Sequence, residues 1–490
     1  MNTLYVLLYT DALIYLLLIA IGVFAVFAAR SKPLRVPWLR VFARPVGMVT
    51  LVVLLAYTVV GVLDSIHYRP VEATGDGGTR VASEVVSVLD TLARPLIEQN
   101  EQTYSAPFAL DSYVQQVVTE ADGRKVQTYP RLSYAGTRLD ETGLTRVEDI
   151  ARRGLVGAGY GLAAWLLGAL ALVLTIAAAT RGPPQRVARR IAGGRTRLAW
   201  RAGLIAALVV SVCVGTLVVL AGDYHVLGTD KVGQDVFYQA VKSIRTGLAI
   251  GTLTTLVMLP FALVLGLLAG YFRGWVDDVI QYLYTTLSSI PGVLLIAAAV
   301  LMMQVYMANN ADAFGTTTER ADLRLLFLCL ILGITSWTSL CRLLRAETRK
   351  LAELDYVAAA RGLGSGPGRI LARHMLPNVM HIVLIQVVLD FSALVLAEAV
   401  LSYIGVGVDP SMNSWGNMIN SARLEMAREP IVWWPLFAAF VFMLVLVLAA
   451  NLFADVVRDA FDPRLRGAEG GEGADANDDS APLQPAGGAR

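Results

Sequence analysis

The sequence predicts an all-α polytopic membrane protein with about nine transmembrane helices, and two observations support this class. Apolar residues make up 56% of the 490 residues and charged residues only 16%, whereas about a quarter of a typical soluble chain is charged. The apolar residues gather in runs of roughly 20, the length that crosses the hydrocarbon core of a bilayer. The predicted spans cover residues 4–29, 46–64, 155–179, 200–221, 246–270, 279–304, 323–341, 380–400 and 432–455.

The charge of the connecting loops predicts the orientation of these spans. With nine spans, the basic segments 30–44, 181–201 and 458–466 all fall on one side of the membrane. The loops 305–322 and 401–431, which carry few basic residues, fall on the other side. Since basic short loops stay cytoplasmic, we expect the N-terminus outside and the C-terminus in the cytoplasm.

The pattern of apolar and polar segments divides the chain into five parts. Residues 1–64 hold two spans, and residues 65–153 form an extracytoplasmic insertion for which we expect a small α+β structure. Residues 154–199 hold a third span and a basic cytoplasmic linker, and residues 200–466 hold the remaining six spans. The acidic tail, residues 467–490, has no aromatic residues and is expected to be disordered. The first run follows "MNT" without a basic region, so we expect it to be retained as a span and not cleaved as a signal peptide.

Two elements are predicted inside the insertion. An amphipathic helix is expected over residues 81–99, bent at Pro95. A β-hairpin is expected to turn at Asp122-Gly123. His67 and His225, which flank spans, are expected at the membrane interface.

The loop between the seventh and eighth spans holds an unusual polar pattern. Residues 345–361, "RAETRKLAELDYVAAAR", are strong helix formers and predict one helix. "GLGSGPG" then forces a turn, with Ser365 as the expected N-cap of the next helix. Ala358, Ala359 and Ala360 give a surface that another protein can approach closely. Such a helix, held between two spans, is either an ordinary basic loop or a lever between a soluble motor and a membrane pore.

Enzymatic and cofactor chemistry finds little support in the sequence. No GxxxxGK[ST] motif is present to cradle ATP phosphates, and no HExxH motif is present to bind zinc. Cys213, Cys329 and Cys341 lie in or beside apolar runs and form neither a disulfide framework nor a CxxC pattern. The lone pair His374 and His381 does not predict a metal site. We therefore expect no catalytic residue, metal or cofactor on this chain.

Two acidic residues lie inside the eighth span. Ionised Asp390 costs about 2.5–3.5 kcal/mol at mid-bilayer, so it should face protein or water. Glu398 lies eight residues further along the same helix. These two residues either make interhelical hydrogen bonds or line a translocation path. A proton-coupled carrier built on them would predict internal two-fold repetition, which the sequence does not show.

The loop pattern has a known counterpart. "YVAAARGLGSGPGRILARHMLPN" (356–378) resembles the "EAA" loop of ABC-importer permease subunits. This sequence departs from that pattern at Ala358, where the family has Glu, and at His374, where it has Ile. Asp355 or Arg361 could replace the salt bridge that the missing Glu would make. The resemblance implies that contact with an ATPase involves Asp355, Tyr356, Ala358, Ala359, Ala360, Arg361, Gly362, Gly364, Leu376, Pro377 and Asn378.

Further stretches narrow the resemblance. "LGTDKVGQDVFYQAVKSIRTGL" (227–248), with Gln234 in place of the usual Arg, is similar to a segment of permeases for dipeptides, oligopeptides and nickel. Residues 268–280 and 396–419 match two more segments of that family, so the resemblance covers about residues 200–466 and is strongest to its "C" type. The family motifs expected on the outer side contain Leu227, Gly228, Thr229, Asp230, Gly233, Asp235, Ser414, Trp415 and Gly416.

The resemblance implies a transport subunit of the bacterial inner membrane with a six-helix permease core. Its expected partners are a second homologous permease, one or two cytoplasmic ATPases that hold ATP and Mg²⁺, membrane lipid, and an extracytoplasmic binding protein. The binding protein would deliver cargo to the face formed by 222–245 and 401–431. That cargo is a di- or oligopeptide, or else nickel or another small solute. The first three spans and the insertion are additional to this core, and one hypothesis makes them a sensor or assembly module.

Overall fold

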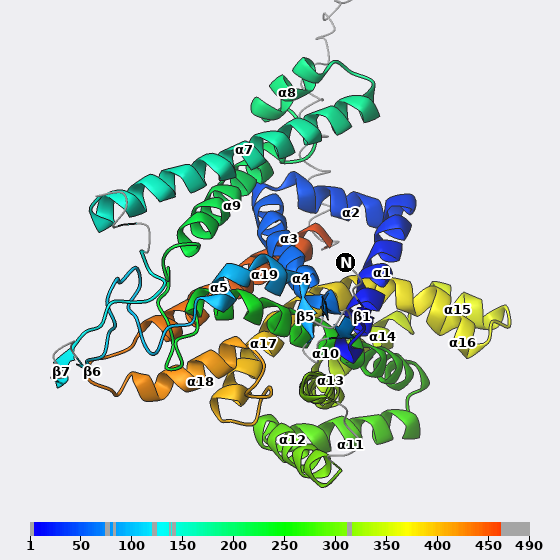
Figure 1. The fold of residues 1–490 in the computed structure, drawn as a ribbon. Helices are drawn as coiled ribbons and strands as arrows, with labels where there is room; N and C mark the ends of the chain where they lie inside the picture. Colours follow the sequence, from blue (N-terminus) through cyan, green and yellow to red (C-terminus); the bar gives the residue numbers. More distant parts are fainter. Residues whose placement is uncertain are drawn as a thin grey trace, which may run out of the picture.

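The computed structural model describes residues 4–73, 79–81, 85–119, 125–136, 139, 144–310 and 316–461 (Figure 1). Within these residues nine helical segments are long and apolar enough to cross a membrane, which confirms the predicted class and number of spans. The acidic tail lies outside the described residues. The candidate spans are Tyr9–Arg30, Pro45–Ser65, Arg146–Thr180, Trp200–Ala221, Val236–Phe272, Gly292–Asn309, Thr317–Leu351, Pro367–Tyr403 and Trp434–Phe461.

Helix α10 (Val236–Phe272) is the centre of the C-terminal bundle, and it packs against α3, α13, α14 and α17. Its 37 residues make it about 55 Å long, so it extends beyond the hydrocarbon core at its ends. Asp235 caps its first turn by accepting the N–H of Tyr238. The other helices from residue 200 onward are α9 (Trp200–Ala221), α11 (Trp275–Ser289), α12 (Gly292–Asn309), α13 (Thr317–Ser336), α14 (Thr338–Leu351), α15 (Asp355–Gly362), α16 (Pro367–Ile370), α17 (Leu376–Tyr403), α18 (Trp415–Glu425) and α19 (Trp434–Phe461).

Two predicted spans contain other elements than the single helix expected of each. Residues 4–6, expected at the start of the first span, form strand β1, and helix α1 (Tyr9–Arg30) begins three residues later. The continuous helix expected over 279–304 is wrong, because the chain breaks between α11 and α12. Pro291 is the N-cap of α12 and lacks the N–H that a helix continuing from α11 would need at this position. Of these two helices, α12 is long and apolar enough to cross a membrane and α11 is not.

The N-terminal helices pack on the side of this bundle and are joined to the insertion by a small sheet. Helices α1, α2 (Lys32–Ala43) and α3 (Pro45–Ser65) follow one another, and α3 packs against α9, α10 and α19. Strand β1 pairs antiparallel with β2 (His67–Arg69), which pairs with β5 (Val86–Ser87). The first residues of the described chain and the start of the insertion are therefore one structural unit.

In the insertion, the structure differs from the predicted helix but agrees with the predicted hairpin. The continuous helix expected over 81–99 is wrong: Val81 ends β4 (Thr79–Val81) and residues 86–87 form β5. Two short helices, α4 (Val88–Leu92) and α5 (Arg94–Glu98), follow. Ser87 starts α4 with a capping box, and Pro95 sits in the first turn of α5, where proline is tolerated. Strand β4 pairs instead with β3 (Val71–Ala73). The predicted hairpin is confirmed by its two strands, β6 (Gln116–Thr119) and β7 (Lys125–Thr128), which pair antiparallel, whereas its predicted turn at Asp122-Gly123 lies outside the described residues.

Helices α7 (Arg146–Thr180), α8 (Pro184–Ala192) and α9 form an arm that extends from the bundle at the top of Figure 1. The α7 and α9 backbones approach closely because glycines face each other where the helices cross. A Cβ on Gly157 would lie 2.6 Å from the carbonyl oxygen of Gly215, and one on Gly161 would lie 2.4 Å from that of Ser211. Small residues at such spacing allow membrane helices to associate closely.

Replacing Gly161 with leucine is expected to separate α7 from α9 and to destabilise the chain by roughly 1–3 kcal/mol, because the new side chain has no space to occupy. Gly159→Leu is the matched control, since nothing lies within 4 Å of a Cβ there. The measurement is thermal unfolding of the two variants in the same detergent. Equal melting temperatures for both variants would contradict this account of the contact.

Candidate functional site

The EAA-like segment, residues 354–378, protrudes beyond the membrane-crossing helices at the end of the bundle that carries α15 and α16 (Figure 1). One face of α15 is anchored in the core: Val357 is fully buried and Ala360 is 8% exposed. Both residues belong to one apolar cluster with Ala269 of α10, Tyr284 of α11 and Leu344 of α14. One face of α15 is therefore part of the apolar core to which α10, α11 and α14 also contribute.

The opposite face of α15 is free and consists mostly of small residues. Ala358 and Ala359 are exposed, and Leu363 just after the helix is 87% exposed. Gly364 follows with a φ of +78°, a conformation that favours glycine and ends the helix. The segment thus presents a low, mostly uncharged ridge with one apolar side chain at its tip, which a groove on another protein could accommodate.

Two local predictions for this segment are wrong. The single helix expected over 345–361 is interrupted, since α14 ends at Leu351 and α15 begins at Asp355. Helix propensity favours continuation there, but burial of Val357 requires the chain to turn back onto the bundle. The N-cap of the next helix is Gly366 and not Ser365.

The start of α17 is joined to α15 by polar contacts. Asn378 donates from Nδ2 to the hydroxyl of Tyr356 (3.1 Å) and to the carbonyl oxygen of His374 (2.6 Å). The rings of Tyr356 and His374 lie 6.3 Å apart. His374, which replaces the family's Ile, therefore packs against α15, in a π-helical turn (Leu371–Met375) that leads into Leu376 and Pro377.

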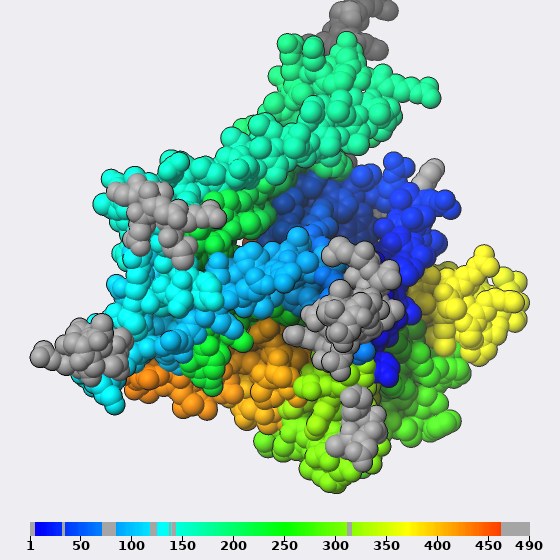
Figure 2. Space-filling view, in the orientation of Figure 1, coloured from blue at the N-terminus to red at the C-terminus, as the bar shows by residue number. Residues whose placement is uncertain are grey.

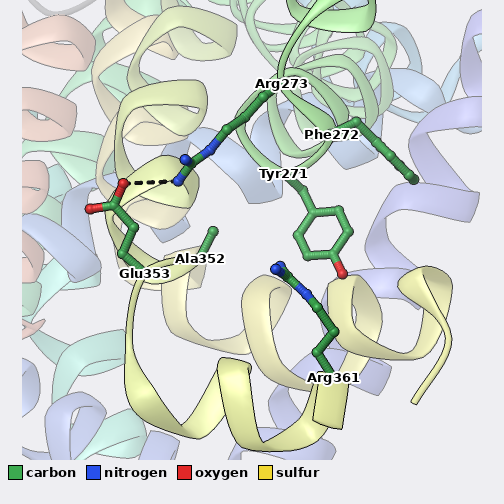
Figure 3. Close-up of a pocket in the computed structure, with 6 residues that line it drawn as sticks. All are labelled: Tyr271, Phe272, Arg273, Ala352, Glu353 and Arg361. Atoms are coloured by element: carbon green, nitrogen blue, oxygen red, sulfur yellow. Dashed lines mark hydrogen bonds and ion pairs between the residues drawn. The ribbon is translucent and has the colours of Figure 1, made fainter. Parts of the chain in front are cut away.

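A cavity of about 430 Å³ separates α15 from the end of α10 (Figure 3). The Arg361 guanidinium lies 5.5 Å from the ring centre of Tyr271, a cation–π contact. Across the cavity, Arg273 donates from Nη2 to Oε1 of Glu353 (2.9 Å). The first contact joins α15 to the end of α10, and the second joins the α10–α11 turn to the α14–α15 connection. The cavity is lined by Tyr271, Phe272, Arg273, Ala352, Glu353 and Arg361.

A more buried ion pair completes this connection. Arg345 of α14 donates from Nε and Nη2 to the two carboxylate oxygens of Asp277 in α11, at 2.5 and 2.7 Å. A bidentate guanidinium–carboxylate pair restricts orientation as well as distance. Helices α10, α11, α14 and α15 are therefore joined by apolar packing and by ion pairs. These contacts connect α15 to the membrane-crossing part of the bundle.

The outer family motifs lie at the opposite end of α10 and are buried. A Cβ on Gly233 would lie 1.8 Å from the carbonyl oxygen of Glu101, so the insertion rests directly on this turn. Thr229 accepts the Ser105 N–H (2.7 Å), and its own carbonyl accepts the Trp434 indole N–H (2.8 Å). These motif residues join α10, α19 and the insertion and do not form an open docking surface.

The second outer motif has the same role. Ser414 caps α18 by accepting the N–H of Asn417 (3.0 Å). Trp415 is 1% exposed and donates from its indole N–H to the carbonyl of Ala240 in α10 (3.0 Å). Gly416 lies against α17, where a Cβ would be 2.4 Å from that of Ser402. This motif therefore holds α18 between α10 and α17.

His225, which was predicted at the membrane interface, is fully buried beside two carboxylates. Its Nδ1 lies 2.8 Å from Asp235 Oδ2, and its Nε2 lies 3.7 Å from Glu101 Oε1. Burial alone would lower the pKa of His225, but the hydrogen bonds and charges of Asp235 and Glu101 outweigh burial and raise this pKa to about 9. The protonated ring therefore joins the insertion to the N-cap of α10.

Stability is expected to fall as pH rises above neutrality, because folding favours the protonated form of His225. The contribution is complete below the ordinary pKa of 6.5 and is lost as pH rises through about 9. It is on the order of 3 kcal/mol. Melting temperatures measured from pH 7 to 10 should fall more steeply for the wild type than for His225→Gln. Parallel curves would contradict the assignment.

A second buried charge cluster was missed by the sequence analysis. Arg245 of α10 donates from Nη2 to Asp11 of α1 (2.6 Å) and lies 3.5 Å from Asp322 of α13. His67 is buried as well, with Nδ1 2.8 Å from Asp11 Oδ2. Thr10 donates a hydroxyl hydrogen bond to Asp322. The only signal in the sequence was the presence of charged residues near the ends of apolar runs.

The two acids of α17 have different environments. Asp390 is half-buried and accepts a hydrogen bond from Gln386 on the same helix (2.8 Å). Glu398 is 1% exposed, accepts the Ser402 hydroxyl (2.7 Å) and faces α18. In this conformation Glu398 is enclosed by protein and makes a structural hydrogen bond. A role for either residue in lining the path stays a prediction.

The fold and the site together define a polytopic membrane subunit with a protruding helical segment joined firmly to the membrane-crossing helices. A family model described as "Binding-protein-dependent transport system inner membrane component" matches residues 262–467. The chain belongs to this family and is an inner-membrane permease subunit of a bacterial ABC importer.

Named relatives agree with this assignment. The glutathione transport system permease protein GsiD of Pectobacterium atrosepticum is 35% identical over 243 residues, which cover 49% of this chain and 73% of that protein. The oligopeptide transport system permease protein OppC of Mycobacterium tuberculosis is 32% identical over 245 residues, covering 50% and 78%. The dipeptide transport system permease protein DppC of Alkalihalophilus pseudofirmus is 31% identical over 242 residues, covering 49% and 73%. A structure of the MetNI methionine ABC transporter aligns with a TM-score of 0.34 at 14% identity, over 46% of this chain and 97% of that one.

Proposed function

We propose that this chain forms half of the translocation path of a di- or oligopeptide importer, with a second homologous permease as the other half. Cytoplasmic ATPases, which would hold ATP and Mg²⁺, bind the EAA-like segment. An extracytoplasmic binding protein supplies the cargo. In this arrangement the N-terminus is outside and the C-terminus is cytoplasmic, as the positive-inside rule predicts.

One observation supports this proposal above the others: α15 is exposed on one face and anchored on the other. Its free face offers Ala358, Ala359 and Leu363 to a partner. Its anchored face contributes Val357 and Ala360 to the apolar cluster that α10, α11 and α14 share. An ATPase that pulls on this helix would therefore move three helices of the bundle, and such a bundle can switch between two arrangements.

The missing Glu at position 358 affects how the segment can be recognised. Asp355 is exposed and has no ion pair among the described residues, so it is free to meet a cation of the ATPase. Arg361 is held against Tyr271 and forms part of the cavity wall. Of the two residues that could replace the family's Glu, we therefore favour Asp355.

The cargo class is inferred from the relatives. Those named above are permeases for glutathione, oligopeptides and dipeptides, and all of these cargoes are small peptides. Nickel or another small solute is the alternative, because this permease type also serves such cargo and the binding protein often sets selectivity.

Affinity purification of the tagged chain from its native membrane in mild detergent tests this function. Recovery of a second permease and one or two ATPases, with a peptide-binding protein, is the expected result. A homo-oligomer without ATPase would overturn the proposal. A complex with a nickel-binding or other solute-binding protein would overturn the peptide assignment alone.

A further inference from the structure

The connection between α7 and α9, residues 181–201, carries a concentration of positive charge that the transport function does not use. It holds seven arginines and no acidic residue. All seven side chains are exposed, and none forms an ion pair within the described part of the chain. The arginines are Arg181, Arg186, Arg189, Arg190, Arg195, Arg197 and Arg201.

The orientation of α8 turns this charge away from the protein. Ile191 is 3% exposed and Val187 is half-buried, so the apolar side of α8 packs onto the arm. Arg186, Arg189 and Arg190 lie on the remaining surface of the helix. The counter-charge for these guanidinium groups must therefore come from outside the described chain.

The arm places this surface directly at the ends of two candidate membrane-crossing helices. Only three residues separate the end of α7 at Thr180 from α8, and α9 begins at Trp200, eight residues after α8 ends. Along α7, Leu155 is 75% exposed and Leu167 is 69% exposed, so the arm offers apolar side chains to acyl chains. Figure 2 shows the arm extending away from the body of the molecule, so that lipid can surround it.

We propose that residues 181–201 bind the headgroups of anionic phospholipids. Phosphate oxygens match the guanidinium fork in geometry and charge. Clusters of basic residues directly after a membrane-crossing helix gain about one kcal/mol per residue near an anionic surface. The α15–α16 pair, where we place the ATPases, lies far from α8 in Figure 1, so the two surfaces can be occupied together.

The experiment compares lipid binding to the purified full-length chain in neutral detergent, with labelled phosphatidylglycerol and phosphatidylcholine as probes. The wild type should bind phosphatidylglycerol in preference. The triple variant R186Q/R189Q/R190Q should bind it roughly 100-fold more weakly, whereas R186K/R189K/R190K should retain most of the affinity. R94Q/R146Q/R428Q, which removes the same charge at the opposite end of the helices, is the matched control and should bind as the wild type does.

Three outcomes would overturn the proposal. Equal affinity of the wild type and R186Q/R189Q/R190Q would exclude these arginines as the binding site. Full competition by millimolar inorganic phosphate would mean that the arginines bind any small anion and not a membrane lipid. Binding that appears only after removal of residues 467–490 would mean that the acidic tail of the chain occupies the arginines.

Discussion

Replacing Ala359 with proline is expected to abolish transport, lowering uptake at least tenfold, while the chain still inserts into the membrane. Ala359 lies in the middle of α15, where its N–H is used by the helix. Proline removes this hydrogen bond and clashes with the preceding turn, at a cost of about 3 kcal/mol or more. Because Ala359 is exposed, the substitution breaks the helix without opening a cavity in the core.

The matched control is a proline that the segment can accept. Gly366 has a φ of −65°, the value that proline fixes, and its N–H makes no backbone hydrogen bond among the described residues. Gly366→Pro should therefore transport at nearly the wild-type rate. Uptake of a labelled peptide is measured in cells that carry the partner subunits and is corrected for the amount of chain in the membrane. Normal uptake by Ala359→Pro would refute the role of α15 as a lever.

The sequence predicted those features whose signal is local. Nine spans could be predicted because each apolar run is continuous along the chain and the membrane requires a fixed length. The β6–β7 hairpin could be predicted from Asp122-Gly123, a turn signal two residues long. The EAA-like segment was found because its residues keep family spacing. In each case the information lies within about 25 residues.

The features that sequence reasoning missed depend on contacts between distant segments. Strand β1 is three residues long and exists because β2, more than 60 residues later, pairs with it. The break before α15 follows from the burial of Val357 against other helices, which helix propensity cannot show. The pairing of Asp11 with Arg245 joins residues 234 positions apart. A single sequence contains no signal for such a pair, whereas the arrangement of α1 beside α10 makes it visible.

Removing Arg245 is expected to be the most destabilising single change at the outer end of the bundle. Asp11 is fully buried and Asp322 is 1% exposed, and Arg245 is the cation that both contact. Arg245→Met keeps most of the side-chain volume but leaves two carboxylates buried without that cation. Loss of one partner from a buried ion pair costs about 3–5 kcal/mol. We therefore expect the variant to unfold at a much lower temperature or to fail to accumulate in the membrane.

Combining this change with neutral partners separates charge from packing. In R245M/D11N/D322N the buried charges are gone, so a large part of the lost stability should return. Arg94→Met is the control, because Arg94 pairs with Glu98 at the surface and such pairs contribute little. Melting temperatures of the four proteins in one detergent give the result. If R245M is as stable as the wild type, α1 is not held to the permease core by this cluster. If R245M loses stability and the triple variant regains it, the additional N-terminal helices are an integral part of the permease. Deleting these helices should then destabilise the core.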